Sequence, residues 1–90
     1  MQCSPNYPNP FNPSTQIDIY TVQKSDLSVS IFDATGRLVN TLIDENLEAG
    51  SYSLKWQGKD SKGHSMPTGV YFIQVKSGVE MSTQKMVLIK

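Results

Sequence analysis

Few residues of this chain are of the types that carry out catalysis, and the single histidine, His64, is the first to consider. Asp60, Ser61 and Ser65 stand close to it in a stretch rich in turn-forming residues. A serine, a histidine and an aspartate held together can activate a hydroxyl for nucleophilic attack. The stretch lacks the strand-to-helix turn that presents such a serine, so we expect His64 to be an exposed loop residue without a catalytic role.

Acidic side chains form a second candidate, because carboxylate oxygens are ligands for calcium. Asp44, Glu45 and Glu48 cluster in the sequence, and Asp33 and Asp60 stand in expected turns. The spacing does not match an EF-hand loop, and aspartate is common in turns because it hydrogen-bonds to its own backbone. We therefore expect neither a metal nor another cofactor.

Composition narrows the classes of function further. The chain has 90 residues, and its 8 lysines and arginines balance 8 aspartates and glutamates, so the formal net charge is zero. This balance does not support nucleic-acid binding, which usually requires a basic surface. The 38% hydrophobic content indicates a folded domain. One domain of this size has little room for a deep substrate pocket, so we expect no enzyme.

The amino-terminal residues do not resemble a secretory leader. Met1 to Pro5 lack the basic start and apolar core of a signal peptide. Cys3 is the only cysteine, so the chain has no internal disulfide, and no basic neighbour makes its thiol reactive. We expect the chain to be the carboxy-terminal part of a longer precursor.

Strands must position these residues, because no window has apolar residues at helical spacing. Alternation of apolar and polar residues is clearest over Leu27–Ile31 and Tyr52–Trp56. Val70–Lys76 is apolar on both faces, which is typical of a central strand. The pattern predicts an all-β fold, an antiparallel β-sandwich of about seven short strands.

Turn residues separate these strands. We expect a turn at Asp33–Gly36, in which Gly36 takes a positive φ, and a hairpin at Ser77–Gly78. Residues 44–50 are acidic and end in glycine, which predicts a loop, and residues 58–69 predict a long connection.

The first fifteen residues differ in composition from the rest. Their four prolines exclude a helix and favour an extended backbone. Tyr7 and Phe11 provide aromatic side chains that can attach this segment to the domain surface. We therefore divide the chain into a proline-rich extended arm, residues 1–15, which we expect to be a linker remnant, and a β-sandwich at residues 16–90.

Two strands begin with a Gly-x-Tyr pattern, at Gly50-Ser51-Tyr52 and within Pro67-Thr68-Gly69-Val70-Tyr71. Proline and glycine shape the turn before a strand, and a tyrosine hydroxyl needs a hydrogen-bond partner. Trp56 has no disulfide beside it, so we expect aliphatic neighbours to cover it.

Lys85 and Lys90 bracket four apolar residues at the end of the chain. Charged ends can protect a buried last strand from edge-to-edge aggregation. The same strand could instead be offered to a receptor by β-augmentation, in which a partner's strand extends the sheet. The residues alone leave both readings open.

In order and spacing, these motifs resemble the type A C-terminal sorting domains of the type IX secretion system, also called the Por secretion system. The resemblance covers residues 6–15, 31–36 and 49–52, Trp56, Pro67-x-Gly69-x-Tyr71 and Lys85-x-x-x-x-Lys90. It extends over essentially the whole chain and implies a compact Ig-like sandwich. The family often has Trp-Asp-Gly where this chain has Trp56-Gln57-Gly58, a departure confined to a turn.

The resemblance implies a targeting function. Such domains end larger secreted enzymes and adhesins of Bacteroidota and related bacteria, which reach the periplasm through a separate signal peptide. The outer-membrane translocon then recognises the folded domain, a sortase-like protease removes it, and the cargo reaches the cell surface or the medium. The implied sorting residues are Pro67, Gly69, Tyr71, Lys85 and Lys90. The residues expected to be structural are Gly36, Gly50, Tyr52 and Trp56.

Two other readings remain open. An Ig-like accessory module of an extracellular protein, acting as a spacer or in adhesion, would have similar strands, as does the flagellar hook-capping Ig-like domain. A sorting domain must end its reading frame, whereas a spacer can be internal. We also expect that the isolated chain can form a homodimer by exchanging its last strand.

Overall fold

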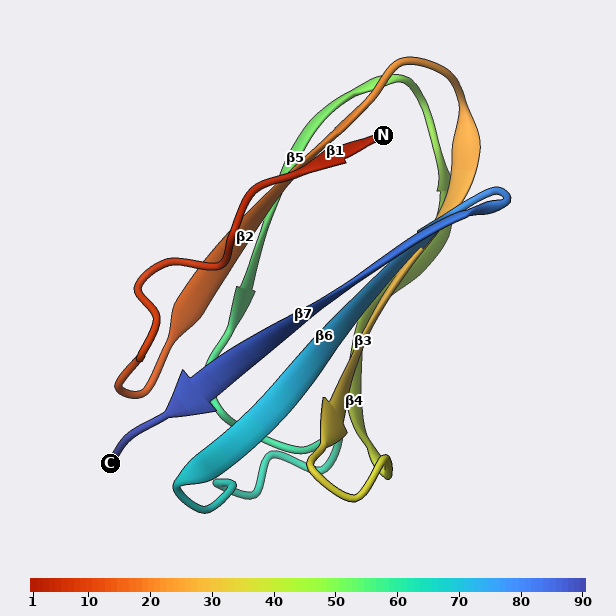
Figure 1. Cartoon of the computed structure of the whole chain (residues 1–90). Helices are drawn as coiled ribbons and strands as arrows, with labels where there is room; N and C mark the ends of the chain where they lie inside the picture. Colours follow the sequence, from red (N-terminus) through yellow and green to blue (C-terminus); the bar gives the residue numbers. More distant parts are fainter.

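The computed structural model describes all 90 residues and consists of seven strands connected by turns and loops (Figure 1). The strands are β1 (Gln2–Cys3), β2 (Thr15–Thr21), β3 (Ser25–Asp33), β4 (Leu38–Leu47), β5 (Gly50–Trp56), β6 (Gly69–Ser77) and β7 (Glu80–Leu88). The structure contains no helix that is long and apolar enough to cross a membrane.

Two antiparallel sheets pack face to face. One has three strands in the order β1-β2-β5, and the other has four in the order β4-β3-β6-β7. This division of consecutive strands between two sheets is that of an Ig-like sandwich and confirms the predicted fold class. β6 lies between β3 and β7, which confirms that the strand apolar on both faces is central.

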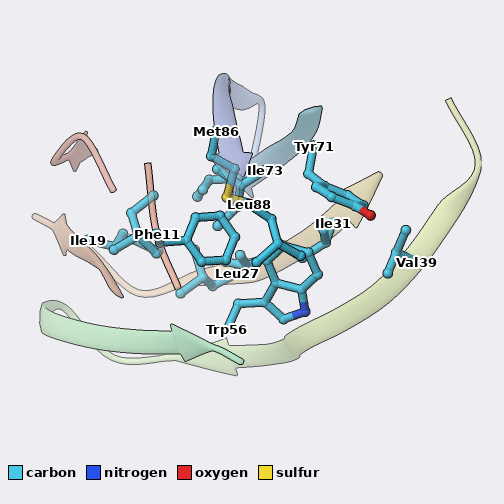
Figure 2. Close-up of a cluster of buried hydrophobic side chains, with 13 residues drawn as sticks. Phe11, Ile19, Leu27, Ile31, Val39, Trp56, Tyr71, Ile73, Met86 and Leu88 are labelled. Carbon is cyan, nitrogen blue, oxygen red and sulfur yellow. The ribbon is translucent and has the colours of Figure 1, made fainter. Parts of the chain in front are cut away.

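The core follows from the alternation of side chains along each strand. Successive residues of a strand point to opposite faces, so every second residue of β2, β3 and β6 enters the space between the sheets. The core residues, most of them labelled in Figure 2, are Phe11, Ile17, Ile19, Leu27, Val29, Ile31, Val39, Trp56, Tyr71, Ile73, Val75, Met86 and Leu88.

The acidic segment before β5 is mostly strand rather than loop. β4 runs to Leu47, and Asp44 and Glu45 pair with β3. The prediction of a loop over residues 44–50 is therefore wrong for residues 44–47 and for Gly50, which begins β5, and holds only for residues 48 and 49. β4 pairs with β3 as far as Leu47, and a register shift between Val29 and Ser30 lets this pairing continue. Because β4 is the edge strand of its sheet, the side chains of Asp44 and Glu45 remain in solvent.

The predicted turn after β3 is confirmed. The Asp33 carboxylate accepts hydrogen bonds from the Thr35 hydroxyl at 2.7 Å and from the backbone N–H groups of Thr35 and Arg37 at 3.0 Å. These bonds, that of the Thr35 hydroxyl foremost, lower the pKa of Asp33 to about 2. Gly36 has a φ of 89°, a left-handed conformation that disfavours a side chain.

The proline-rich arm packs against the sandwich (Figure 1). It begins as β1 on the edge of β2, and Tyr7 continues this pairing through two backbone hydrogen bonds with Gln16, both 2.9 Å. The arm then crosses to the other sheet, where Phe11 pairs in parallel with Leu88 of β7. It therefore connects the two sheets along one side of the sandwich. The domain boundary at residue 15 stays a prediction.

Candidate recognition site

The Pro67-x-Gly69-x-Tyr71 motif forms a closed turn at the start of β6. The Tyr71 hydroxyl donates a hydrogen bond of 2.6 Å to the backbone carbonyl of Pro67, and its ring is buried. Burial, together with the negative charge of Asp33, raises the pKa of the Tyr71 hydroxyl, so this group remains a donor at neutral pH. The motif thus fixes the exposed Pro67 next to the first residues of β6, a central strand.

A second tyrosine uses the same device at the start of β5. The Tyr52 hydroxyl donates a hydrogen bond to the backbone carbonyl of Glu48, and Gly50 stands between them as Gly69 does in the first motif. The repeated Gly-x-Tyr pattern indicated two strand starts correctly. The pattern did not indicate that each tyrosine hydroxyl bonds to the backbone carbonyl of the residue four positions before it. That acceptor belongs to the backbone, so it does not depend on residue type.

Trp56 links the first motif to the arm. Its ring lies 5.2 Å from the ring of Tyr71 and 5.6 Å from that of Phe11, measured between centroids (Figure 2). Its indole N–H donates a hydrogen bond of 2.8 Å to the Lys59 carbonyl. We expected aliphatic neighbours, but these two ring contacts are aromatic. One of them comes from the arm, 45 residues away in sequence, which local patterns could not reveal.

Replacing Tyr71 with phenylalanine tests whether the first motif stabilises the fold. The change keeps the ring against Trp56 but leaves the Pro67 carbonyl without its donor, so we expect the free energy of unfolding to fall by about 1–2 kcal/mol. Urea unfolding followed by the fluorescence of Trp56, the only tryptophan, measures this. Tyr20→Phe is the control, since the Tyr20 side chain is exposed. Equal stability of the two variants would contradict a structural role for the hydroxyl.

The two terminal lysines are exposed and form no salt bridge within the chain. Lys85 lies on β7 opposite Phe72, and Lys90 follows the end of that strand. The spacing of five residues separates the two by roughly 17 Å along an extended chain. Their charges are thus available to a partner.

The end of β7 lies beside the turn of the first motif. Gly69 pairs with Leu88, and the backbone N–H of Lys90 donates a hydrogen bond of 3.1 Å to the Thr68 hydroxyl. The Asp33–Gly36 turn lies at the same end, since Asp33 pairs with Tyr71. We call the surface formed by residues 67–69 and 89–90 the motif end. It joins two motifs that are separate in the sequence.

The other candidate groups have local structural roles. The Asp60 carboxylate accepts hydrogen bonds from the backbone N–H groups of His64 and Lys62, at 2.8 and 2.9 Å, which lower its pKa. The exposed His64 ring lies 3.3 Å from the same carboxylate and forms no hydrogen bond to Ser61 or Ser65. These contacts order a turn. No three acidic, histidine or cysteine side chains are placed to share a metal ion.

Sequence reasoning missed a polar cluster that holds the arm. Asp18 on β2 accepts hydrogen bonds from the Tyr7 hydroxyl at 2.6 Å, from the Ser53 hydroxyl at 2.7 Å and from the Gln16 amide at 3.0 Å. These bonds, the one from Tyr7 foremost, lower the pKa of Asp18. The only signal in the sequence was the tyrosine in the arm, since the other members of the cluster lie on β2 and β5.

Comparison with known proteins places these features in a family. A family model described as the FlgD Ig-like domain matches residues 9–80. The basal-body rod modification proteins FlgD of Salmonella typhimurium strain LT2 and Salmonella typhi are each 33% identical over 63 residues. That match covers 69% of this chain, which spans only 27% of the length of those relatives.

Solved structures share the fold. FlgD from P. aeruginosa is 28% identical, with a TM-score of 0.62, over 82% of this chain and 57% of its own. PorZ of Porphyromonas gingivalis, described as an essential bacterial surface component of the type-IX secretion system, is 27% identical, with a TM-score of 0.65, over 94% of this chain and 11% of its own. Dimeric latent PorU from the same bacterium has a TM-score of 0.68 at 24% identity, over 93% of this chain and 9% of its own, and shows the fold alone. Since the family model covers most of the chain, this protein belongs to the FlgD Ig-like domain family.

Proposed function

We propose that this domain is a sorting signal that directs a larger cargo protein, attached on its amino-terminal side, through the type IX outer-membrane secretion machinery. The observation that carries the proposal is the motif end, where the Pro67 turn and Lys90 form one exposed surface. The similarity to PorZ, a component of that system, supports it further.

The domain acts in this proposal by being recognised, not by catalysis, and needs no cofactor. β7 presents Lys85, and Lys90 follows the strand with its backbone N–H bonded to the Thr68 hydroxyl. Neither lysine side chain has an ion-pair partner within the chain, so acidic groups of the translocon can pair with both. The protein passes through the periplasm to the outer membrane, and a sortase-like protease removes the domain as the cargo reaches the cell surface or the medium.

A second candidate function is that of an Ig-like structural module, a spacer or an adhesive domain of an extracellular protein. The family match and the 33% identity to FlgD favour it, because neither depends on the terminal lysines. A spacer is defined by its fold and its connections. Substitution of exposed lysines should therefore leave the function of a spacer unchanged.

Replacing both Lys85 and Lys90 with alanine separates the two functions. We expect the free energy of unfolding to change by less than about 0.5 kcal/mol, because both side chains are exposed. We expect a cargo fused to this variant to stay in the periplasm. Cell fractionation and urea unfolding measure the two effects.

A double variant that replaces Lys55 and Lys62 with alanine is the matched control for that experiment. These lysines are also exposed and form no salt bridge, so the control removes the same charge from elsewhere on the surface. It should be exported normally. Full surface export of the Lys85 and Lys90 double variant would contradict the proposed sorting role.

A further inference from the structure

The outer face of the four-stranded sheet points away from the core and is divided into two halves. Alternate residues of β3 and β6 enter the core, so the residues between them point to this outer face. In the half away from the motif end, the outward residues of these two central strands are Ser28, Ser30, Gln74 and Lys76. Such polar residues are usual where an antiparallel sheet has one face in water.

The half next to the motif end is apolar instead. Phe32 of β3 lies directly opposite Phe72 of β6. Val70 of β6 lies opposite Val87 of β7, and Leu38 of β4 pairs with Phe32 at the other side of the sheet. We call these five residues the apolar patch. None of them is among the buried core residues or the partly buried residues that pack against the core.

The apolar patch is in contact with solvent. Leu38 is 60% exposed, and the other four side chains are partly exposed. Pairing within the sheet does not require apolar residues there, because β3 and β6 pair just as regularly across the polar half. Single apolar residues on a surface are ordinary, whereas a contiguous group of them marks a site of interaction with another molecule.

Cations border the apolar patch. Lys85 lies opposite Phe72 and so ends its row at the edge strand β7. Arg37 directly precedes Leu38, and its side chain is 82% exposed. The Asp33 carboxylate stands close by but is only 16% exposed, because it accepts hydrogen bonds from the turn that follows it. The border of the patch is therefore positively charged toward solvent.

This border decides which kind of partner fits. A second copy of the chain, packed face to face, would bring a second Lys85 and a second Arg37 to the patch, and like charges oppose such packing. A membrane fits poorly, since insertion needs apolar groups that reach roughly 5–10 Å into the lipid and most of these side chains lie partly covered on the sheet. A protein surface with apolar side chains surrounded by carboxylates complements both the patch and its border.

We propose that the apolar patch is a docking face for the receptor that recognises this domain, and that the receptor meets it with apolar side chains bordered by carboxylates. Lys85 belongs both to the border of the patch and to the terminal motif, so the patch continues the surface proposed for recognition. Apolar contact supplies affinity, and the two cations set the orientation of the partner. The inference rests on the proposed sorting function and names the chemistry of its partner.

Replacing Phe72 with threonine tests the docking face in a reporter protein that carries this domain at its carboxy terminus. In a bacterium with the type IX system, the amount of reporter at the cell surface or in the medium should fall at least about tenfold, because a central apolar contact is lost. Gln74→Thr is the matched control, since Gln74 is the next outward residue of the same strand and lies in the polar half. It should be exported like the unchanged domain.

A second variant guards against a loss of folding. Phe72 pairs with Phe32 across two central strands, so its replacement also weakens the sheet. Leu38 lies on the edge strand β4 and is mostly exposed, so Leu38→Thr should keep a cooperative urea transition. It should still lower export at least about threefold. If Phe72→Thr does not fold, the export of Leu38→Thr decides the outcome.

The outcomes separate the docking face from the sorting function. Normal export of the folded patch variants would overturn the docking face and leave the sorting function intact. If the unchanged domain is not exported either, the sorting function fails and the docking face fails with it.

Two measurements on the purified domain identify a different occupant. Sedimentation over a range of concentrations detects a second copy, and flotation with phosphatidylglycerol vesicles detects a membrane. We expect neither self-association nor vesicle binding. Either one, if Phe72→Thr abolished it, would assign the patch to that occupant and overturn the proposal.

Discussion

Replacing Phe11 with alanine is expected to lower the free energy of unfolding by about 3–5 kcal/mol. The residue belongs to the arm, yet its ring is 1% exposed and lies 5.6 Å from that of Trp56. Its backbone also holds the end of β7 through two hydrogen bonds. Small domains have a total stability of about 5–15 kcal/mol, so this one change would remove a large part of it.

Urea unfolding followed by Trp56 fluorescence measures this effect, because the indole is buried in the folded state. Tyr20→Ala is the matched control. It truncates an aromatic residue that is 46% exposed, so we expect a loss of less than about 1 kcal/mol. If Phe11→Ala were as stable as the control, the arm would not be part of the folded core.

Deleting residues 86–90 is expected to unfold the domain as well as to remove the terminal motif. Met86 and Leu88 are fully buried, and the loss of each side chain costs about 2–5 kcal/mol. The deletion also removes the hydrogen-bond partners of Phe11. The combined loss approaches the whole stability of a small domain.

Circular dichroism and urea unfolding of the shortened chain measure this second effect. Removal of Lys90 alone is the control and should leave a cooperative transition, because that side chain is exposed. A shortened chain that still unfolded cooperatively would contradict the place of β7 in the core. Export of the deletion variant cannot by itself diagnose recognition, which is why the lysine substitutions are the sharper test.

The burial of β7 in the core makes dimer formation by strand exchange more costly. β7 contributes Met86 and Leu88 to the core and pairs with β6 along its whole length. Exchange of this strand between two copies would first have to open that core. The strand-exchanged homodimer stays a prediction, and a concentration series in solution scattering checks it.

The strands that alternate in hydrophobicity were predictable from the sequence. Tyr52–Trp56 and Val70–Lys76 lie in β5 and β6 as predicted. A strand that buries one or both faces has apolar residues at the buried positions, so the sequence shows it directly. The hairpin between β6 and β7 was also predicted, but its turn residues are Gly78 and Val79, one position later than expected, because Ser77 still pairs with Glu80. These features depend on neighbours that are close in the sequence.

Features that depend on distant partners were not predictable. The arm showed its extended backbone through its prolines, but nothing in it revealed that Phe11 enters the core or that Asn9 bonds to β7. The extension of β4 through Asp44 and Glu45 was hidden, because an exposed edge strand tolerates the acidic residues that also favour loops. Both follow from contacts between segments far apart in the chain.

The residues of the candidate site were predicted from the sequence, but their arrangement in space was not. Pro67, Gly69, Tyr71, Lys85 and Lys90 came from the resemblance to sorting domains. That the two motifs meet at one end follows from the register of β6 against β7, in which Gly69 faces Leu88. A register is set by a whole sheet, so no single motif encodes it.

The most direct test of the sorting role is the location of a reporter protein. The reporter carries an amino-terminal signal peptide and this domain at its carboxy terminus, and it is expressed in a bacterium with the type IX system and in a strain that lacks it. We expect the reporter at the cell surface or in the medium only when both the domain and the system are present. A reporter that stays in the periplasm in both strains would contradict the sorting role and favour the structural module.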